Sequence, residues 1–282
     1  MAEPARQTFA ATTSAKRQAF RQLHESGCFV LPNPWDVGSA LFLQSLGFKA
    51  LASSSAGFAW SRGGPDGSLT REQVLAHLKE LVTSSALPIN ADFENGFGRD
   101  AEAVAESVRL AVETGVAGLS IEDSSGDPAR PIFDLDTAVQ RLRAARAAID
   151  RTGGETLLVG RAENFFVGRP DLPDTIARLE AYAEAGADCL YAPGIRTREQ
   201  ISAVVAALAP KPVNVLIAWP TDLTLESLAA LGVRRVSVGG ALARVAWGGL
   251  QRAAQSLAEG RFDGFAAAAS APELNALFGG QR

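Results

Sequence analysis

Acidic and basic side chains end several of the apolar, β-branched runs in this sequence. Asp92 and Glu94 lie at the end of "PINADFE", Glu122 at the end of "AGLSIE" and Arg161 at the end of "LLVGR". Carboxylates buried without a partner are too costly to keep ionised, so a group of them implies a metal cation, an arginine or shared protons. Asp92, Glu94 and Glu122 offer hard oxygen ligands without imidazole or thiolate, which favours Mg²⁺, or Mn²⁺, over zinc.

Single acidic residues after strands also have a purely structural interpretation. A carboxylate at such a place is often the N-cap of the next helix, as Asp100 and Asp123 could be. The glycines that follow Glu94 could be ordinary turn residues. We nevertheless favour a functional site, because several acids and one arginine occur together at the ends of different runs. Asn214, at another run, is a further candidate for substrate binding.

Eight short apolar runs can act as the strands that position these side chains. They cover residues 28–32, 49–54, 88–93, 117–123, 156–164, 188–193, 212–218 and 235–240. Segments with helical spacing separate them, and several begin at Thr or Asp and end at Gly. Such alternation requires parallel strands joined by right-handed helical crossovers. We predict an α/β fold of the (β/α)₈ TIM-barrel type, with a doubly wound open sheet as the alternative, and expect the polar strand ends to meet at one mouth.

The chain reads as one domain over residues 1–282, with a C-terminal helical extension from about 241 to 282. Hydrophobic residues make up 47% of the sequence, enough for a large core, and no Pro- or Ser-rich linker divides it. The net charge of −4 gives no electrostatic reason to expect nucleic acid or an anionic membrane as a partner. No apolar run reaches the roughly 20 residues of a membrane span.

Cysteine and histidine are scarce, which limits the chemistry. Cys28 and Cys189 are far apart, which fits a reducing compartment, and we predict a cytoplasmic protein. His24 and His77 fall in helical patterns, where we expect solvated or half-buried side chains. A histidine metal site or a Ser-His-Asp triad is therefore disfavoured. Three tryptophans, Trp60, Trp219 and Trp247, are expected to serve packing.

Five segments, in order, resemble the isocitrate lyase/phosphoenolpyruvate mutase superfamily. They are "GFKALASSSA…PDG", "ADFENGFG", "LSIEDS", "LVGRAEN" and "EAGADCLYAP", and the resemblance extends from "LPNPWDVGSA" to "VSVGGALARVAWGGL". It implies a metal site at Asp92, Glu94 and Glu122, with Glu94 where most members have Asp. It also implies that Arg161 holds the substrate.

The same resemblance implies how a substrate binds. The segment Ser54-Ser55, followed by Ala56, matches backbone amides that bind a substrate carboxylate, and Asp66 matches an aspartate of the family's loop. In the implied chemistry, Mg²⁺ chelates a small 2-oxo or 2-hydroxy carboxylate, and an enolate-like oxyanion forms as a C–C or P–C bond breaks. Arg161, Glu122 and Asp66 are the implied catalytic residues, and Asp92 is also expected to contact the substrate.

Two departures from the family narrow the reaction. The segment 124–136, "SSGDPARPIFDLD", has neither the cysteine nor the histidine of the isocitrate lyase loop, and Pro193 replaces a mutase histidine. By elimination we favour decarboxylation or a related C–C cleavage of a small 2-oxo acid, as in a carbon–carbon lyase. Phosphonopyruvate hydrolysis or mutase-type P–C chemistry is one alternative, and a barrel that binds a 2-oxo acid without turnover is another. Residues 61–70 and 124–133 are candidate lids.

The resemblance also implies a homo-oligomer, a homodimer or homotetramer, with its C-terminal helix exchanged between subunits. The apolar segment "GGALARVAWGGLQRAAQSL" suits that exchange, and it would equally suit packing on its own barrel.

Overall fold

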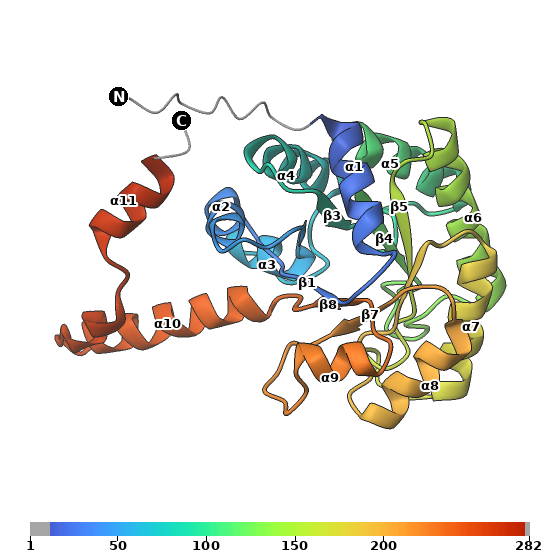
Figure 1. The fold of residues 1–282 in the computed structure, drawn as a ribbon. Helices are drawn as coiled ribbons and strands as arrows, with labels where there is room; N and C mark the ends of the chain where they lie inside the picture. Colours follow the sequence, from blue (N-terminus) through green and yellow to red (C-terminus); the bar gives the residue numbers. More distant parts are fainter. Residues whose placement is uncertain (1–11, 280–282) are drawn as a thin grey trace.

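Eight parallel strands form one sheet that curls into a barrel (Figure 1). The computed structural model describes residues 12–279. The strand order is β1-β8-β7-β6-β5-β4-β3-β2, and at the seam the Ala52 amide donates to the Pro32 carbonyl at 3.0 Å. The strands are β1 (Phe29–Leu31), β2 (Leu51–Ala52), β3 (Ile89–Asp92), β4 (Gly118–Glu122), β5 (Leu157–Arg161), β6 (Cys189–Tyr191), β7 (Val213–Leu216) and β8 (Arg235–Ser237). The predicted (β/α)₈ barrel is confirmed.

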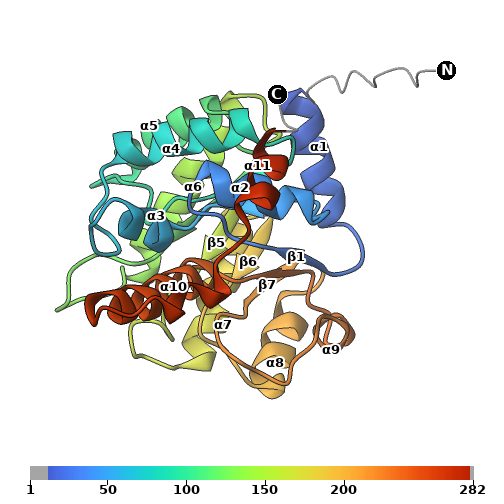
Figure 2. The ribbon, with the colours of Figure 1, turned by 90° about the vertical axis from the view of Figure 1, so that its left-hand side faces the viewer.

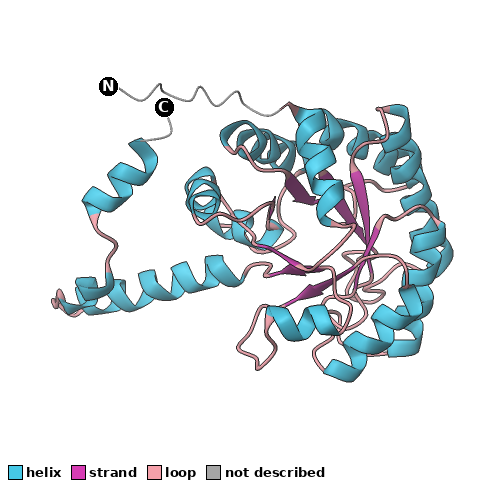
Figure 3. Ribbon diagram, in the orientation of Figure 1, coloured by secondary structure: helices cyan, strands magenta, loops and turns pink. Residues whose placement is uncertain are grey.

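Helices surround the barrel because each strand is followed by a helical crossover (Figure 3). They are α1 (Thr13–Leu23), α2 (Val37–Ser45), α3 (Ser55–Ser61), α4 (Arg71–Ser84), α5 (Ala101–Glu113), α6 (Leu135–Arg151), α7 (Leu172–Glu184), α8 (Arg198–Leu208) and α9 (Leu225–Ala230). Helix α4 shows how the sequence produces them. Thr70 and Gln73 form a reciprocal capping box at its start, and Val74, Leu78 and Leu81 form the stripe that it buries.

The inside of the barrel combines small apolar side chains with a buried polar layer. Phe20 of α1 closes the bottom of the barrel beside Leu31 and Leu157. Above them, Arg235 Nε donates to Asn214 Oδ1 at 2.8 Å, and Arg235 Nη1 lies 3.3 Å from His24 Nε2. Arg235, Asn214 and His24 thus form a hydrogen-bonded polar layer inside the barrel.

Both histidines are more deeply buried than the sequence indicated, and the expectation of solvated or half-buried side chains was wrong. His24 Nδ1 lies 2.8 Å from the Phe20 carbonyl, so Nδ1 carries the proton and Nε2 accepts from Arg235. Burial, and then the charge of Arg235, lower the pKa of His24 to about 3. His77 stacks on Phe58 at 3.8 Å, and burial lowers its pKa to about 4. Both imidazoles are therefore neutral parts of the core.

The C-terminal helices lie outside the barrel, to its left in Figure 1 and in front of it in Figure 2. Helix α10 (Ala241–Ala258) leads away from the strands, the 3-10 helix η1 (Asp263–Ala267) packs against it, and α11 (Ala271–Gly279) contacts α2. Ala243 is the one residue of α10 that is buried. Several large apolar side chains in this region remain exposed, among them Val245, Leu250 and Phe262. In the described part of the chain, every helix is too short or too polar to cross a membrane.

Candidate active site

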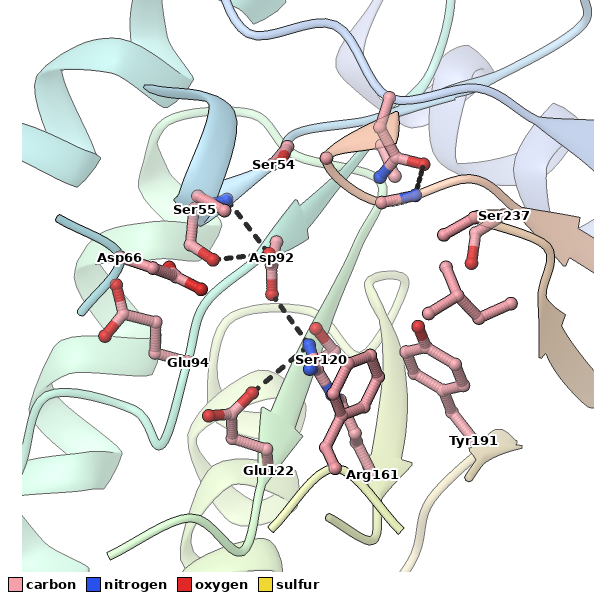
Figure 4. A pocket seen from close by; sticks show the side chains of 18 of the residues that line it. Ser54, Ser55, Asp66, Asp92, Glu94, Ser120, Glu122, Arg161, Tyr191 and Ser237 are labelled. Carbon is pink, nitrogen blue, oxygen red and sulfur yellow. Dashed lines mark hydrogen bonds and ion pairs between the residues drawn. The ribbon is translucent and has the colours of Figure 1, made fainter. Parts of the chain in front are cut away.

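A cavity of about 690 Å³ opens among the carboxyl ends of the strands (Figure 4). Every site residue that the sequence singled out lines it: Ser54, Ser55, Ala56, Asp66, Asp92, Glu94, Glu122, Arg161 and Asn214. They meet because parallel strands place their carboxyl ends, and the loops that follow, at one face of a barrel. Neither His24 nor His77 is among the residues that line it.

Arg161 forms the centre of this cavity. Its Nη1 lies 3.3 Å from Asp92 Oδ1 and 3.2 Å from Glu122 Oε2, and its Nε lies 2.5 Å from Glu163 Oε1. The Glu122–Arg161 pairing follows from the register, which sets these two residues side by side on β4 and β5. One guanidinium thus faces three carboxylates, a geometry that holds it rigidly.

Asp92 is also held from the opposite side. Its Oδ2 accepts from the Ser55 amide at 2.9 Å and from the Ser55 hydroxyl at 2.8 Å, where α3 begins. Ser54 Oγ caps the same helix by accepting from the Gly57 amide. The resemblance assigns the Ser54–Ala56 amides to a substrate carboxylate. In this structure the Ser55 amide and hydroxyl donate to the carboxylate of Asp92, and their contact with a substrate carboxylate stays a prediction.

A tight turn after β3 returns Glu94 to the cavity. Glu94 has φ +46° and Phe97 has φ +52°, both in the left-handed region, and Gly96 follows with φ +85°. Side chains with a Cβ rarely adopt this conformation, so Glu94 is held there by its surroundings. The Asn95 amide group donates to the Ser124 carbonyl at 3.1 Å, and Arg141 Nη2 donates to the Asn95 and Gly98 carbonyls. The glycines therefore allow a turn that places two acids of one strand end in the same cavity.

The cavity carries more negative charge than Arg161 can balance. Asp66, Asp92, Glu94, Glu122 and Glu163 all line it. Burial, followed by the charges of Asp92 and Asp66, raises the pKa of Glu94 to about 7. Burial and Asp92 also raise the pKa of Asp66, and burial raises that of Glu122 well above its ordinary value. These shifts mean that the site takes up protons unless a cation balances the carboxylates.

The donor chemistry of the cavity fits a hard divalent cation. Glu94 Oε1 is buried and has no hydrogen-bond partner within residues 12–279, and the neighbouring carboxylates of the cavity offer oxygen atoms as ligands. Within residues 12–279, no three acidic, histidine or cysteine side chains are placed so as to enclose a metal ion. Mg²⁺ usually keeps several waters and takes only one or two protein carboxylates, so such a cage is not required. The assignment of Asp92, Glu94 and Glu122 as ligands stays a prediction.

A buried network behind the cavity supports Glu163, which ends the same apolar run as Arg161 and has no role assigned from the sequence. Asp123 Oδ1 accepts from the Glu163 amide at 2.8 Å, and Asp123 Oδ2 accepts from Tyr182 at 2.7 Å and Arg178 at 3.2 Å. Asp123 is therefore not the helix cap considered above, whereas Asp100 does cap α5. Two residues after Arg161 on the same run, Glu163 could have been found from its spacing.

Asn214 lies in the floor of the cavity. Its Nδ2 donates to Ser237 Oγ at 2.9 Å, and its Oδ1 accepts from Arg235. These bonds make Asn214 part of the polar layer of the barrel. Its predicted contact with substrate stays a prediction.

Aromatic side chains also line the cavity, including one that the sequence did not single out. Tyr191 ends β6 and faces the cavity, with the Arg161 guanidinium 5.1 Å from its ring, whereas Pro193 does not line the cavity. Burial raises the pKa of Tyr191 to about 12. Trp60 and Trp219 also line the cavity, and their expected role in packing stays a prediction. Residues two apart in a strand point to the same face, so Tyr191 shares the face of Cys189 at the end of this strand. That spacing was the signal that could have identified Tyr191.

The two candidate lids border the opening. Asp66 and Gly67 of the segment 61–70 line the cavity, as do Ser124 and Gly126 of the segment 124–133. The second segment folds back on itself through a bridge between Ser124 and Ile132. Arg130, its cation, is largely exposed, with 87% of its side chain accessible.

Comparison with known proteins identifies clear relatives. The family model for phosphoenolpyruvate phosphomutase matches residues 20–258. The chain is 30% identical over 245 residues to oxaloacetate decarboxylase of Paraburkholderia xenovorans LB400, covering 83% of this chain and 78% of the relative. A provisionally assigned lyase/mutase from Burkholderia cenocepacia J2315 is 47% identical, with a TM-score of 0.92 over 95% of this chain and 97% of the other. Oxaloacetate acetylhydrolase, solved with its product oxalate, is 27% identical, with a TM-score of 0.84 over 95% and 96% of the two chains.

Proposed function

The chain belongs to the phosphoenolpyruvate phosphomutase family, and from that premise we propose that it is a Mg²⁺-dependent lyase that cleaves a C–C bond of a small 2-oxo or 2-hydroxy (di)carboxylate. One observation carries the proposal. A single guanidinium, Arg161, lies among carboxylates at the carboxyl ends of the strands, beside a buried carboxylate oxygen of Glu94 that has no partner. This arrangement suits a cation and an anionic substrate together.

Different residues of the cavity would bind the metal ion, bind the substrate and exclude water. Asp92, Glu94 and Glu122 would hold the divalent ion, which would act as a Lewis acid toward the developing oxyanion. Arg161 binds a substrate carboxylate through its N–H donors, and Glu163 keeps its Nε side in place. The Ser55 amide and hydroxyl, which donate to Asp92 in this structure, would exchange that partner for the other end of the 2-oxo acid function. Tyr191 and the two loops at the opening exclude water from the reacting carbons.

Decarboxylation or hydrolytic C–C cleavage is the reaction we favour. The segment 124–136 has no cysteine or histidine to donate a proton in the manner of an isocitrate lyase. Two relatives named above act on oxaloacetate, by name a decarboxylase and an acetylhydrolase. P–C bond chemistry is the second candidate, and the observation that favours it is the match to the phosphomutase family model.

Turnover with a panel of 2-oxo and 2-hydroxy acids tests the proposal. With Mg²⁺ and oxaloacetate we expect enzyme-dependent release of either pyruvate with CO₂, or oxalate with acetate, and EDTA should abolish it. Because Mg²⁺ alone also promotes decarboxylation of oxaloacetate, a Glu122→Gln variant at equal concentration serves as the blank. It should be at least about a hundredfold slower, since it weakens the binding of the divalent ion that would stabilise the developing oxyanion.

Three outcomes separate the alternatives. A shift of the phosphorus NMR signal of phosphonopyruvate, without C–C cleavage of any acid, would move the assignment to P–C chemistry. Binding of 2-oxo acids without any product after long incubation would indicate a binding protein. Turnover that is equally fast in EDTA contradicts the metal-dependent mechanism.

We further propose that the protein is a cytoplasmic homo-oligomer, a dimer or tetramer. Both cysteines are free thiols, which suits a reducing compartment. The apolar side chains of α10 that face solvent, such as Val245 at 69% and Leu250 at 56% exposure, are those that a second copy would cover.

A charge on α10 should dissociate the oligomer. We expect light scattering to give two or four times the 29.5 kDa of one chain for the native protein, and 29.5 kDa for Leu250→Asp. Gln18→Asp, a change at an exposed position of α1, should keep the native mass. A native protein that runs at 29.5 kDa at all concentrations contradicts the proposal.

A further inference from the structure

Two guanidinium groups that line the cavity have no carboxylate partner among the residues that the structure describes. Arg196 lies in the loop between β6 and α8, and Arg244 lies in the first turns of α10. Across residues 12–279, neither lies within 4.0 Å of an acidic oxygen. The other two arginines that line the cavity already have partners: Arg161 pairs with carboxylates, and Arg235 donates to Asn214 in the buried polar layer. The cavity therefore has free positive charge as well as its acidic centre.

The position of Arg196 is fixed by its surroundings. Its guanidinium carbon lies 4.0 Å from the centre of the Trp219 ring, which follows β7 and also lines the cavity. In the same loop Ile195 is 1% exposed, and the Arg196 amide donates to Gln200 Oε1 at 2.9 Å. Gly194 has φ +96°, and a Cβ there would lie 2.7 Å from Phe165, so the loop depends on glycine to pass so closely.

Stacking on Trp219 leaves the hydrogen-bonding edge of Arg196 available. A guanidinium that lies over an aromatic ring uses its face, and the N–H donors in its plane remain free to form a fork with a carboxylate or phosphonate. Arg244 adds a second donor close by, since its Nη1 lies 3.5 Å from the carbonyl of Ala218, the residue before Trp219. Three separate segments of the chain thus build one cationic, aromatic wall.

We propose that this wall, with Arg196 supported by Trp219 and flanked by Arg244, binds a second anionic group at the distal end of the substrate. The inference rests on the proposed function and specifies its substrate class as dianionic 2-oxo acids. The acidic centre can bind a 2-oxo carboxylate only with a cation, and it repels any further negative charge. A second anionic group is therefore directed to the cations of the wall, away from Asp66, Glu94 and Glu122.

Binding of three matched probes tests the proposal without relying on turnover. The probes are 2-oxopentanoate, with no distal charge, 2-oxoglutarate, with a distal carboxylate, and 2-oxo-4-phosphonobutanoate, with a distal phosphonate. Calorimetry with Mg²⁺ present should show that the native protein binds at least one dianion about tenfold more tightly than 2-oxopentanoate, as expected for one charge-assisted contact. The dianion with the larger preference identifies the distal group.

Variants assign the preference to Arg196. Arg196→Met keeps an unbranched apolar stem without the guanidinium and should reduce the preference to nearly one, while 2-oxopentanoate affinity stays within twofold. Trp219→Leu should reduce it in part. Arg198→Met is the matched control, because Arg198 is exposed, lies two residues away and does not line the cavity, and it should keep the native preference.

Each outcome bears on one proposal or the other. Equal binding of all three probes by the native protein, no binding of any probe, or an unchanged preference in Arg196→Met overturns the inference. An Arg196-dependent preference without turnover of any 2-oxo acid upholds it and removes the proposed lyase activity. Turnover of a 2-oxo acid without an Arg196-dependent preference upholds the proposed lyase activity and overturns the inference about the wall.

Discussion

Replacing Arg161 with alanine is expected to lower kcat/KM by at least about a thousandfold and to abolish measurable binding of 2-oxo acids. The guanidinium contacts Asp92, Glu122 and Glu163, and no other arginine of the cavity lies in this position. Its removal takes away the donors for the substrate carboxylate and leaves three carboxylates facing one another. Steady-state kinetics and calorimetry on the same preparation measure both effects.

Loss of activity must be separated from loss of the fold, because removing one partner of a buried ion pair costs roughly 3–5 kcal/mol. Arg146→Ala is a matched control. Arg146 is as buried as Arg161, with 17% against 16% of the side chain exposed, and it also pairs with two carboxylates, Asp150 and Asp188, away from the cavity. It should lose stability and keep native kinetics. Arg161→Lys keeps the charge without the fork and should remain at least about a hundredfold impaired.

The role assigned to Arg161 would be lost if the alanine variant, shown to be folded by circular dichroism, bound 2-oxo acids with native affinity. Equal loss of activity in Arg146→Ala would also contradict it, because the effect would then come from general destabilisation.

Replacing Glu94 with glutamine should stabilise the metal-free protein at pH 8 and remove most of the stabilisation that Mg²⁺ provides. The pKa of Glu94 is about 7 in the folded protein, against the ordinary 4.5 that we take for the unfolded chain. The folded state therefore holds this proton longer, so its stability falls as the pH rises from about 4.5 to about 7. At about 1.36 kcal/mol per pKa unit, the loss is at most about 3 kcal/mol and smaller where solvent screens the group.

Glutamine has nearly the same shape as glutamate and carries no charge. The raised pKa of Glu122 lowers stability with rising pH in both proteins. The difference between their free energies of unfolding therefore reports on Glu94 alone. Denaturant unfolding in EDTA at pH 5 and pH 8 measures this difference in the free energy of unfolding. We expect nearly equal free energies of unfolding at pH 5 and a more stable variant at pH 8. Added Mg²⁺ should then raise the stability of the native protein at pH 8, because it binds the folded state.

Glu80→Gln, on the exposed face of α4, is the control and should follow the native protein at both pH values. If the free energies of unfolding of the native protein and Glu94→Gln in EDTA change equally between pH 5 and pH 8, the buried, unpaired state of Glu94 is contradicted. Undiminished stabilisation of Glu94→Gln by Mg²⁺ would remove Glu94 from the metal site.

The sequence by itself determined the parallel α/β architecture and the strand-end residues that meet in its cavity. Eight apolar runs alternate with helical segments, and only parallel strands with helical crossovers accommodate that order. Because parallel strands bring their carboxyl ends to one face, the strand-end residues Asp92, Glu122 and Arg161 had to meet. Residue type and spacing are local properties, so they could be read without coordinates.

Only the tertiary structure decided which partner each group takes. Ser55 donates to Asp92, Asp123 supports Glu163, and Arg196 lies on Trp219, although the members of each pair are 20 or more residues apart in the sequence. The burial that raises the pKa of Glu94 likewise depends on chain segments that pack around the turn after β3. Hydrogen bonding and desolvation depend on distances of a few ångströms between distant segments, and no local pattern of residues contains that information.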